Sequence, residues 1–119
     1  MGSVSIRGAT TVEKNESKEI LAATEELLKE ILDRNNIQKE DIQNIIFTST
    51  GDIDAAYPAV SARNMGIRDA ALMCFQEMHV EGSLKMCIRI MLTAESQMSQ
   101  KDVKHVYLKG SKVLRPDIA

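Results

Sequence analysis

The chain has 119 residues, of which 44% are hydrophobic and 27% are charged, a composition typical of one globular domain spanning residues 1–119. Its net charge of -2, from 15 basic and 17 acidic residues, excludes the strongly basic character expected of a nucleic-acid-binding domain. No apolar run approaches the ~18 residues of a transmembrane helix and no signal-peptide core is present, so we expect a cytoplasmic protein that does not bind membranes.

The first half of the chain predicts a strand, a long helix and a second strand. The β-branched residues of 4–12 favour a strand interrupted near Gly8. From Ser17 to Arg34, apolar residues recur at helical spacing, and the opposite side carries acidic and basic residues four positions apart. After a stop at Asn35 and Asn36, we expect a helical turn over 38–42 and a buried strand over 44–50.

The second half predicts three strands and one short helix. Pro58 suits the first position of a helix that runs to about Met65, and Gly66 suits the residue just past its end. Apolar or alternating segments predict strands over 71–75, 85–95 and 104–108, with a turn around Gly82 and a capped turn over 99–102. Pro116 should stop regular structure in the tail.

These elements predict the α+β class, with a mixed five-stranded sheet, one long helix and short helical turns. One helix of this length cannot cover both faces of five strands. We therefore expect the uncovered face to pack on another subunit, which makes the protein an oligomer.

The stretch MCIRIML, residues 86–92, places Arg89 within a strand that otherwise reads as core. A guanidinium there requires a partner, a wet cavity or an anionic ligand. Three other arginines stand at unusual places: Arg7 near the end of the first predicted strand, Arg63 on the short helix and Arg115 in the tail. Glu77 directly follows a buried strand. Several arginines near an open sheet face favour a small anion with more than one carboxylate. The alternatives are an inter-subunit salt bridge at Arg89, a solvated Arg63, and a Glu77 that simply pairs with Arg89.

Other chemistries fit the sequence less well. The spacing of His79, His105, Cys74 and Cys87 matches no zinc pattern, so we expect no metal site. A Cys74 nucleophile with a histidine base is conceivable, but a buried structural thiol is the simpler interpretation. Glycine-rich phosphate loops are absent from the sequence.

Five segments together resemble the monofunctional, trimeric α/β-type chorismate mutases: IRGATTVE at 6–13, AAYPAVSAR at 55–63, CFQEM at 74–78, CIRIMLT at 87–93 and KHVYLKGSKVLRPDI at 104–118. The resemblance implies a homotrimer built as a pseudo-α/β barrel, with three active sites in the clefts between neighbouring subunits. It also implies the conversion of chorismate to prephenate in phenylalanine and tyrosine biosynthesis, without a cofactor.

The resemblance further implies roles for individual residues. Arg7 would bind a substrate carboxylate, Arg89 would be the cation beside the breaking ether bond, and Glu77 would meet the ring hydroxyl. The remaining implied contacts are Tyr107 with a carboxylate, Cys74 and Met73 on the ring side, and Tyr57, Ala59, Arg63, Leu114 and Arg115 at the rim.

Two further expectations concern how the site is assembled. We expect Arg7 and Arg89 to come from different chains. Val60 stands where some relatives carry lysine, so a carboxylate contact from that position is lacking here. The alternative functions are an imine deaminase on a similar trimeric scaffold and a non-catalytic sensor of an aromatic-pathway acid.

Overall fold

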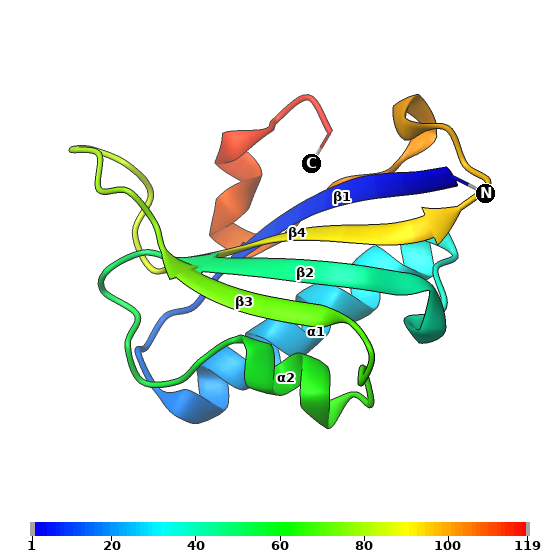
Figure 1. The fold of residues 1–119 in the computed structure, drawn as a ribbon. Coiled ribbons are helices and arrows are strands. Elements are labelled where there is room, and N and C mark those ends of the chain that lie inside the picture. The colour runs from blue at the N-terminus through cyan, green and yellow to red at the C-terminus, as the bar shows by residue number, and fades with distance from the viewer. Residues whose placement is uncertain (1, 119) are drawn as a thin grey trace.

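The computed structural model describes residues 2–118, in which five strands form one mixed sheet (Figure 1). The strands are β1 (Gly2–Thr11), β2 (Ile42–Ser49), β3 (Ala71–Gln76), β4 (Cys87–Ser96) and β5 (Val106–Tyr107), in the order β3-β2-β4-β1-β5. The central strand β4 runs antiparallel to β1 and β2, whereas β3 is parallel to β2 and β5 is parallel to β1. The predicted α+β class and the mixed five-stranded sheet are confirmed.

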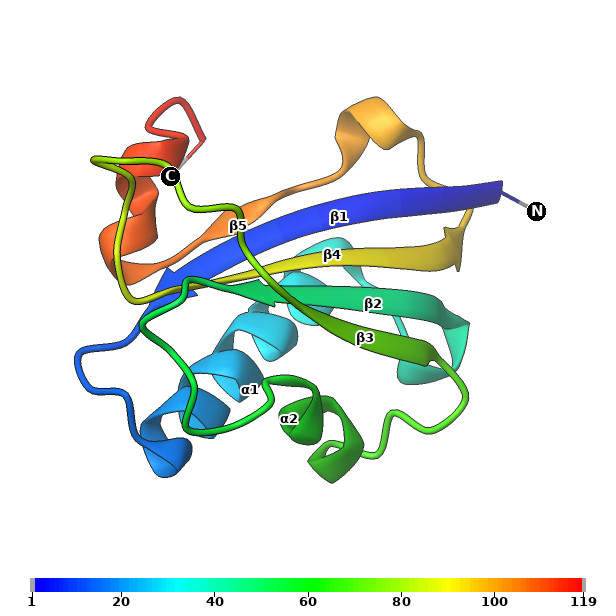
Figure 2. The ribbon, with the colours of Figure 1, turned by 60° about the vertical axis from the view of Figure 1, so that its left-hand side comes forward.

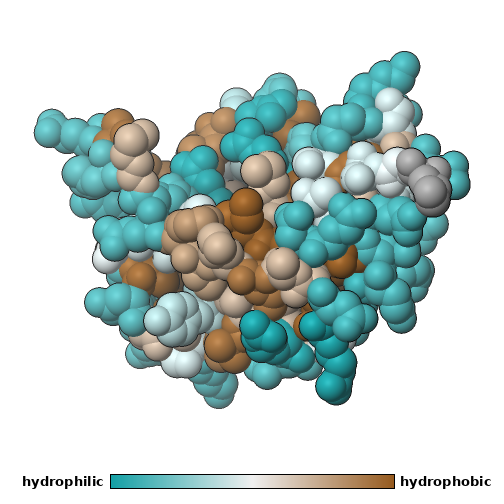
Figure 3. All heavy atoms as spheres, in the orientation of Figure 1, coloured by the Kyte–Doolittle hydropathy of each residue, from teal (hydrophilic) through white to brown (hydrophobic). Residues whose placement is uncertain are grey.

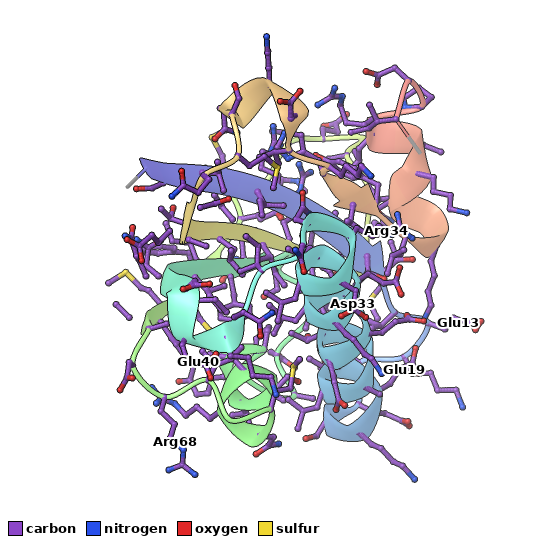
Figure 4. The ribbon with its side chains drawn as sticks, turned by 90° about the vertical axis from the view of Figure 1, so that its right-hand side faces the viewer. Glu13, Glu19, Asp33, Arg34, Glu40 and Arg68 are labelled. Atoms are coloured by element: carbon purple, nitrogen blue, oxygen red, sulfur yellow. The ribbon has the colours of Figure 1, made fainter. Side chains whose placement is uncertain are left out.

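Both α-helices lie on one side of this sheet (Figure 2). The long helix α1 (Ser17–Asn35) buries an apolar stripe against the strands, and the short helix α2 (Ala59–Asn64) packs beside it. Charged residues of α1 such as Asp33 and Arg34 project away from the sheet (Figure 4). The main core between the layers includes the fully buried side chains Ile6, Leu27, Leu28, Ile31, Ile45, Phe47 and Leu92. This amphipathic packing explains why the helical spacing was a reliable signal.

The helix stop and the short turns also follow the prediction. Asn36 adopts a left-handed conformation with φ of 53° just past α1, a conformation that asparagine tolerates better than most residues. The expected turns are the 3-10 helices η1 (Lys39–Asp41) and η2 (Gln100–Asp102). A third 3-10 helix, η3 (Lys109–Leu114), was not predicted. It is held by the Ser111 hydroxyl, which donates to the carbonyl oxygens of Ala9 and Leu108.

Strand β1 corrects one prediction, because it continues through Gly8 without interruption. Gly8 lies where the α1 side chains Leu27 and Ile31 pack against β1. A Cβ atom there would lie 2.8 Å from Cδ1 of Ile31 and 3.1 Å from the carbonyl oxygen of Val106. Gly8 therefore permits close helix packing and does not end the strand.

Strand β5 is shorter than the predicted 104–108 because side chains replace part of its backbone pairing. The amide of Arg7 donates to Nδ1 of His105 at 2.9 Å. The backbone of Lys104 is bound by the buried Asn35 side chain, which accepts from its N–H and donates to its carbonyl. Only Val106 and Tyr107 remain paired with β1.

The sheet face opposite α1 and α2 is the open face. It carries the exposed apolar side chains Met73, Phe75 and Met91. Figure 3 views the molecule with α1 behind the sheet, and apolar side chains gather near the middle of that view. None of the helices within residues 2–118 is both long and apolar enough to cross a membrane.

Candidate active site

The pairing register aligns five side-chain positions in one row across the open face. Arg89 on β4 lies between Thr48 of β2 and Ala9 of β1. Ala9 in turn pairs with Tyr107 of β5, and Thr48 pairs with Phe75 of β3. Because directly paired residues project to the same face of a sheet, the strand alternation that places Ile88 and Ile90 in the core directs Arg89 to the open face.

Glu77 is the acidic partner of Arg89. It directly follows β3, and its amide donates to the carbonyl oxygen of Ser49 at 2.9 Å. Its Oε2 lies 3.0 Å from Nε of Arg89, and the two side chains are 16% and 34% exposed, respectively. The two charged groups are thus held side by side in a partly buried environment, where screening by solvent is reduced.

The Arg89–Glu77 contact is an ion pair without an aligned hydrogen bond. The Nε atom of Arg89 is buried, and within residues 2–118 it has no acceptor in hydrogen-bonding geometry, despite the short distance to Glu77. The contact therefore contributes little as a hydrogen bond, because its N–H is misdirected. The hydroxyl of Thr48 donates to the same Oε2 at 2.8 Å and does form a hydrogen bond.

Apolar side chains form the floor beside Arg89. Ala9, Cys87 and Tyr107 are buried together, with Leu84 and Leu114 packed against them. Burial raises the pKa of the Cys87 thiol to about 11, even though the nearby Arg89 opposes the shift. Cys87 is therefore a neutral thiol at physiological pH and a poor nucleophile. Tyr107, expected to contact a carboxylate, is only 4% exposed.

Two further arginines lie at the margin of this row. Arg7 pairs with Met91, and Ala9 two residues later pairs with Arg89. Arg7 and Arg89 are thus diagonal neighbours on the same face of one chain, roughly 7–8 Å apart at the backbone. This register argues against the expectation that the two arginines come from different chains.

Arg115 lies in the tail just beyond η3. Its Nε and Nη2 donate to Oδ1 and Oδ2 of Asp117 at 3.1 and 2.9 Å. These hydrogen bonds raise the pKa of Arg115 and lower the pKa of Asp117. In this structure Arg115 is therefore engaged by a carboxylate of its own tail.

The other predicted residues lie apart from this group. Tyr57, Ala59 and Arg63 belong to α2 and the loop before it, on the helix side of the sheet, and Tyr57 is 72% exposed. Cys74 packs against the core on that side, whereas its neighbour Met73 is on the open face. Successive strand residues face opposite ways, but β3 is the edge strand of the sheet, and the expected contacts of Cys74 and Met73 with the ring stay a prediction.

Two clefts correspond to these two groups of residues. One of about 460 Å³ is lined by Glu77 and by the loops 50–52 and 76–85. The second, of about 450 Å³, is lined by Tyr57, Cys74 and neighbouring residues. Within a single chain, the structure thus places the predicted residues in two separate groups.

Sequence reasoning missed a group of hydrogen bonds among Thr50, Asp52, Met86 and Cys87 at the start of β4. Asp52 accepts from the amide of Met86, which has a left-handed φ of 53°, and from the hydroxyl of Thr50. Thr50 also binds the amide and carbonyl of Cys87. Burial raises the pKa of Asp52, but the hydrogen bonds from Thr50 and Met86 lower it, and the pKa is lowered overall. These hydrogen bonds hold the backbone of β4 in place two residues before Arg89.

The arrangement offers fixed positive charge beside a carboxylate and an apolar floor. Among residues 2–118, no three histidine, cysteine, aspartate or glutamate side chains converge to hold a metal ion. The charged groups can bind a small polycarboxylate and stabilise negative charge that develops close to Arg89.

Comparisons with known proteins identify relatives over nearly the whole chain. The family model described as chorismate mutase type I matches residues 3–118. The chain is 42% identical to chorismate mutase AroH of Bacillus subtilis over 96% of its own length and 91% of that relative. It is 41% identical to the AroH protein of Thermus thermophilus, over 95% of this chain and 93% of that one. A chorismate mutase structure from Clostridium thermocellum superposes with a TM-score of 0.90 at 53% identity, covering 92% of this chain and 97% of that one.

Proposed function

The chain belongs to the type I chorismate mutase family, and we propose that it converts chorismate to prephenate with Arg89 as the principal catalytic residue. The reaction is an intramolecular [3,3] rearrangement, in which an ether C–O bond breaks while a C–C bond forms. The rearrangement requires no proton transfer, nucleophile or electron acceptor. An enzyme accelerates such a step by binding the transition state more tightly than the substrate.

The observation that carries the proposal is the position of Arg89. Its guanidinium is held on the central strand beside the carboxylate of Glu77, and within residues 2–118 its buried Nε–H has no acceptor in hydrogen-bonding geometry. Negative charge builds on the ether oxygen as the C–O bond lengthens, and a preorganised donor stabilises that charge without moving. Arginine suits this role because it remains charged in a partly buried environment.

The other groups on the open face would bind and orient the substrate. Arg7 is exposed beside Arg89 and can bind one of the two substrate carboxylates. Glu77 can accept a hydrogen bond from the ring hydroxyl and offset positive charge that spreads over the ring. Contacts at both ends of the substrate hold the enolpyruvyl arm over the ring in the reactive conformation. Tyr107 and Leu114 would supply part of the apolar wall.

The separation of the predicted residues supports a site shared between subunits. In a homotrimer, the Arg89 group of one chain would face the Tyr57, Ala59 and Arg63 group of its neighbour. The exposed Met73, Phe75 and Met91 provide the apolar surface on which chains would associate. Arg7 and Arg89, as diagonal neighbours, would come from the same chain.

A direct assay tests the activity. Purified protein should remove chorismate, followed by its ultraviolet absorbance, and form an equal amount of prephenate. A run in heavy-oxygen water should leave the product mass unchanged, because the rearrangement incorporates no solvent oxygen. Incorporation of solvent oxygen would favour hydrolytic chemistry such as imine deamination, and binding without turnover would favour a sensor.

The shared site has its own test. If residues from two chains complete each site, activity per chain should fall when dilution dissociates the trimer, as followed by sedimentation. A fully active monomer would contradict the interface placement but leave the reaction assignment intact.

A further inference from the structure

We propose that Thr48 is a positioning residue, which holds the Glu77 carboxylate out of an aligned hydrogen bond with Arg89 and so leaves the guanidinium free to act on the substrate. This inference rests on the proposed function of Arg89 and Glu77. Thr48 is not among the residues that the sequence assigned to the site.

The first support is the set of contacts at Glu77. Within residues 2–118, the only hydrogen bond that its carboxylate makes is from the Thr48 hydroxyl, at 2.8 Å to Oε2. Arg89 approaches the same oxygen to 3.0 Å, but its N–H is not directed at it. Thr48 is therefore the group that fixes where Oε2 lies, and Oε1 has no hydrogen-bond partner among these residues.

The second support is the rigidity of the supporting residues. Thr48 is directly opposite Arg89 in the β2–β4 pairing, so the same ladder positions the hydroxyl and the guanidinium. The Glu77 backbone is tied to the next residue of β2 through the carbonyl of Ser49. Glu77 is thus held by β2 through both its backbone and its carboxylate, whereas the residues that follow it, Met78 onward, are exposed.

The consequence for catalysis follows because Thr48 and Arg89 both approach the same carboxylate oxygen, Oε2 of Glu77. Without the hydroxyl, the Glu77 carboxylate can turn and accept an aligned hydrogen bond from Arg89, because charge-assisted pairs of this kind are strongly favourable. The guanidinium would then be held by Glu77 and would be less available to the substrate's ether oxygen. The loss would affect the transition state more than the bound ground state, and kcat should fall while KM changes little.

The test compares Thr48→Val, which removes the hydroxyl at nearly constant shape, with Thr48→Ser, which retains it. We expect about tenfold lower kcat for T48V, the size typical of a lost hydrogen bond to a charged group, and near-normal kcat for T48S. Thr93→Val is the matched control, because Thr93 is also on the open face and, within residues 2–118, its hydroxyl makes a single hydrogen bond, to the Ser5 hydroxyl at 3.4 Å. Equal kcat in wild type and T48V would overturn the proposal, as would failure of T48S to restore it.

A double-mutant cycle identifies the route of the effect. If Thr48 acts through Glu77, T48V should have little further effect in a Glu77→Ala background. An undiminished effect in that background would overturn the proposal. Thr48→Ala repeats the comparison if T48V does not fold.

A readout independent of turnover separates this inference from the assigned reaction. A crystal structure of T48V should show the Glu77 carboxylate rotated into an aligned hydrogen bond with Arg89 Nε. An unchanged carboxylate would refute the positioning role even in an active enzyme. A wild-type protein that does not consume chorismate would refute the proposed function, while the crystallographic comparison would still decide the role of Thr48.

Discussion

Replacing Arg89 with glutamine tests the electrostatic role most directly. The substitution keeps a polar side chain on β4 but removes the permanent charge beside Glu77. We expect kcat to fall by roughly 10²–10³-fold, the effect of deleting one preorganised donor at developing charge. KM should change much less, because in the proposed site Arg7 would still bind a substrate carboxylate.

The magnitude follows from the environment of the guanidinium. The Arg89 side chain is 34% exposed, so an effective dielectric constant near 20 is more appropriate than the value for a dry interior. Two unit charges about 4 Å apart then interact by about 4 kcal/mol. The ether oxygen carries only part of a charge in the transition state, but it also gains an aligned hydrogen bond. The sum is about 3–4 kcal/mol, which matches the expected fall in rate.

The measurement is steady-state kinetics of chorismate loss, together with thermal unfolding at one protein concentration. Arg34→Gln is the matched control, since Arg34 also forms an ion pair, at 2.8 Å with Glu30, but on the outer surface of α1. That variant should retain normal kcat and lose less than about 1 kcal/mol of stability. If R89Q turned over within about threefold of wild type, the reasoning would be wrong.

Three further predictions concern binding, pH dependence and packing. Arg7→Gln should raise KM by about tenfold, with a smaller fall in kcat; the reverse pattern in steady-state kinetics would assign Arg7 to the transition state instead. Burial, together with Arg7 and Arg115, lowers the pKa of His105. As the pH falls, His105 is therefore protonated more readily in the unfolded chain than in the folded chain, and the free energy of unfolding should decrease below about pH 6.5. Urea unfolding across this range should show a smaller decrease for His105→Gln than for the exposed-site control His79→Gln, and equal slopes would contradict the assignment. Gly8→Ala should lower the free energy of unfolding by about 1–3 kcal/mol, because its Cβ would lie 2.8 Å from Cδ1 of Ile31; an unchanged urea midpoint would mean that α1 shifts at no cost.

The local patterns of the sequence predicted the elements well. Alternation within 86–92 correctly separated Arg89 from the core residues Ile88 and Ile90. The same rule places Met73 and Cys74 on opposite faces of the sheet. Local periodicity is reliable in such cases because it depends only on backbone geometry.

Features that depend on distant partners could not be predicted. Gly8 in a β-rich segment is compatible with a break or with close helix packing, and only the position of α1 distinguishes them. Helix η3 depends on hydrogen bonds from Ser111 to Ala9 and Leu108, the first of which spans most of the chain. The contact between Thr48 and Glu77 depends on the β2–β4 register and on the parallel placement of β3. Sequence patterns identify candidates for a face, but they do not fix such registers.

The order of the strands also determines when the catalytic surface can form during synthesis. Gly2 pairs with Ser96 and Thr11 pairs with Cys87, so the partners of β1 leave the ribosome only after most of the chain has been made. Until then, the N-terminal strand has neither β4 nor β5 to pair with, and its apolar side is unprotected. Such long-range pairings close slowly and leave strand edges open to other chains. The two arginines that adjoin in the folded sheet therefore meet at a late step of folding, when the first strand made is finally paired.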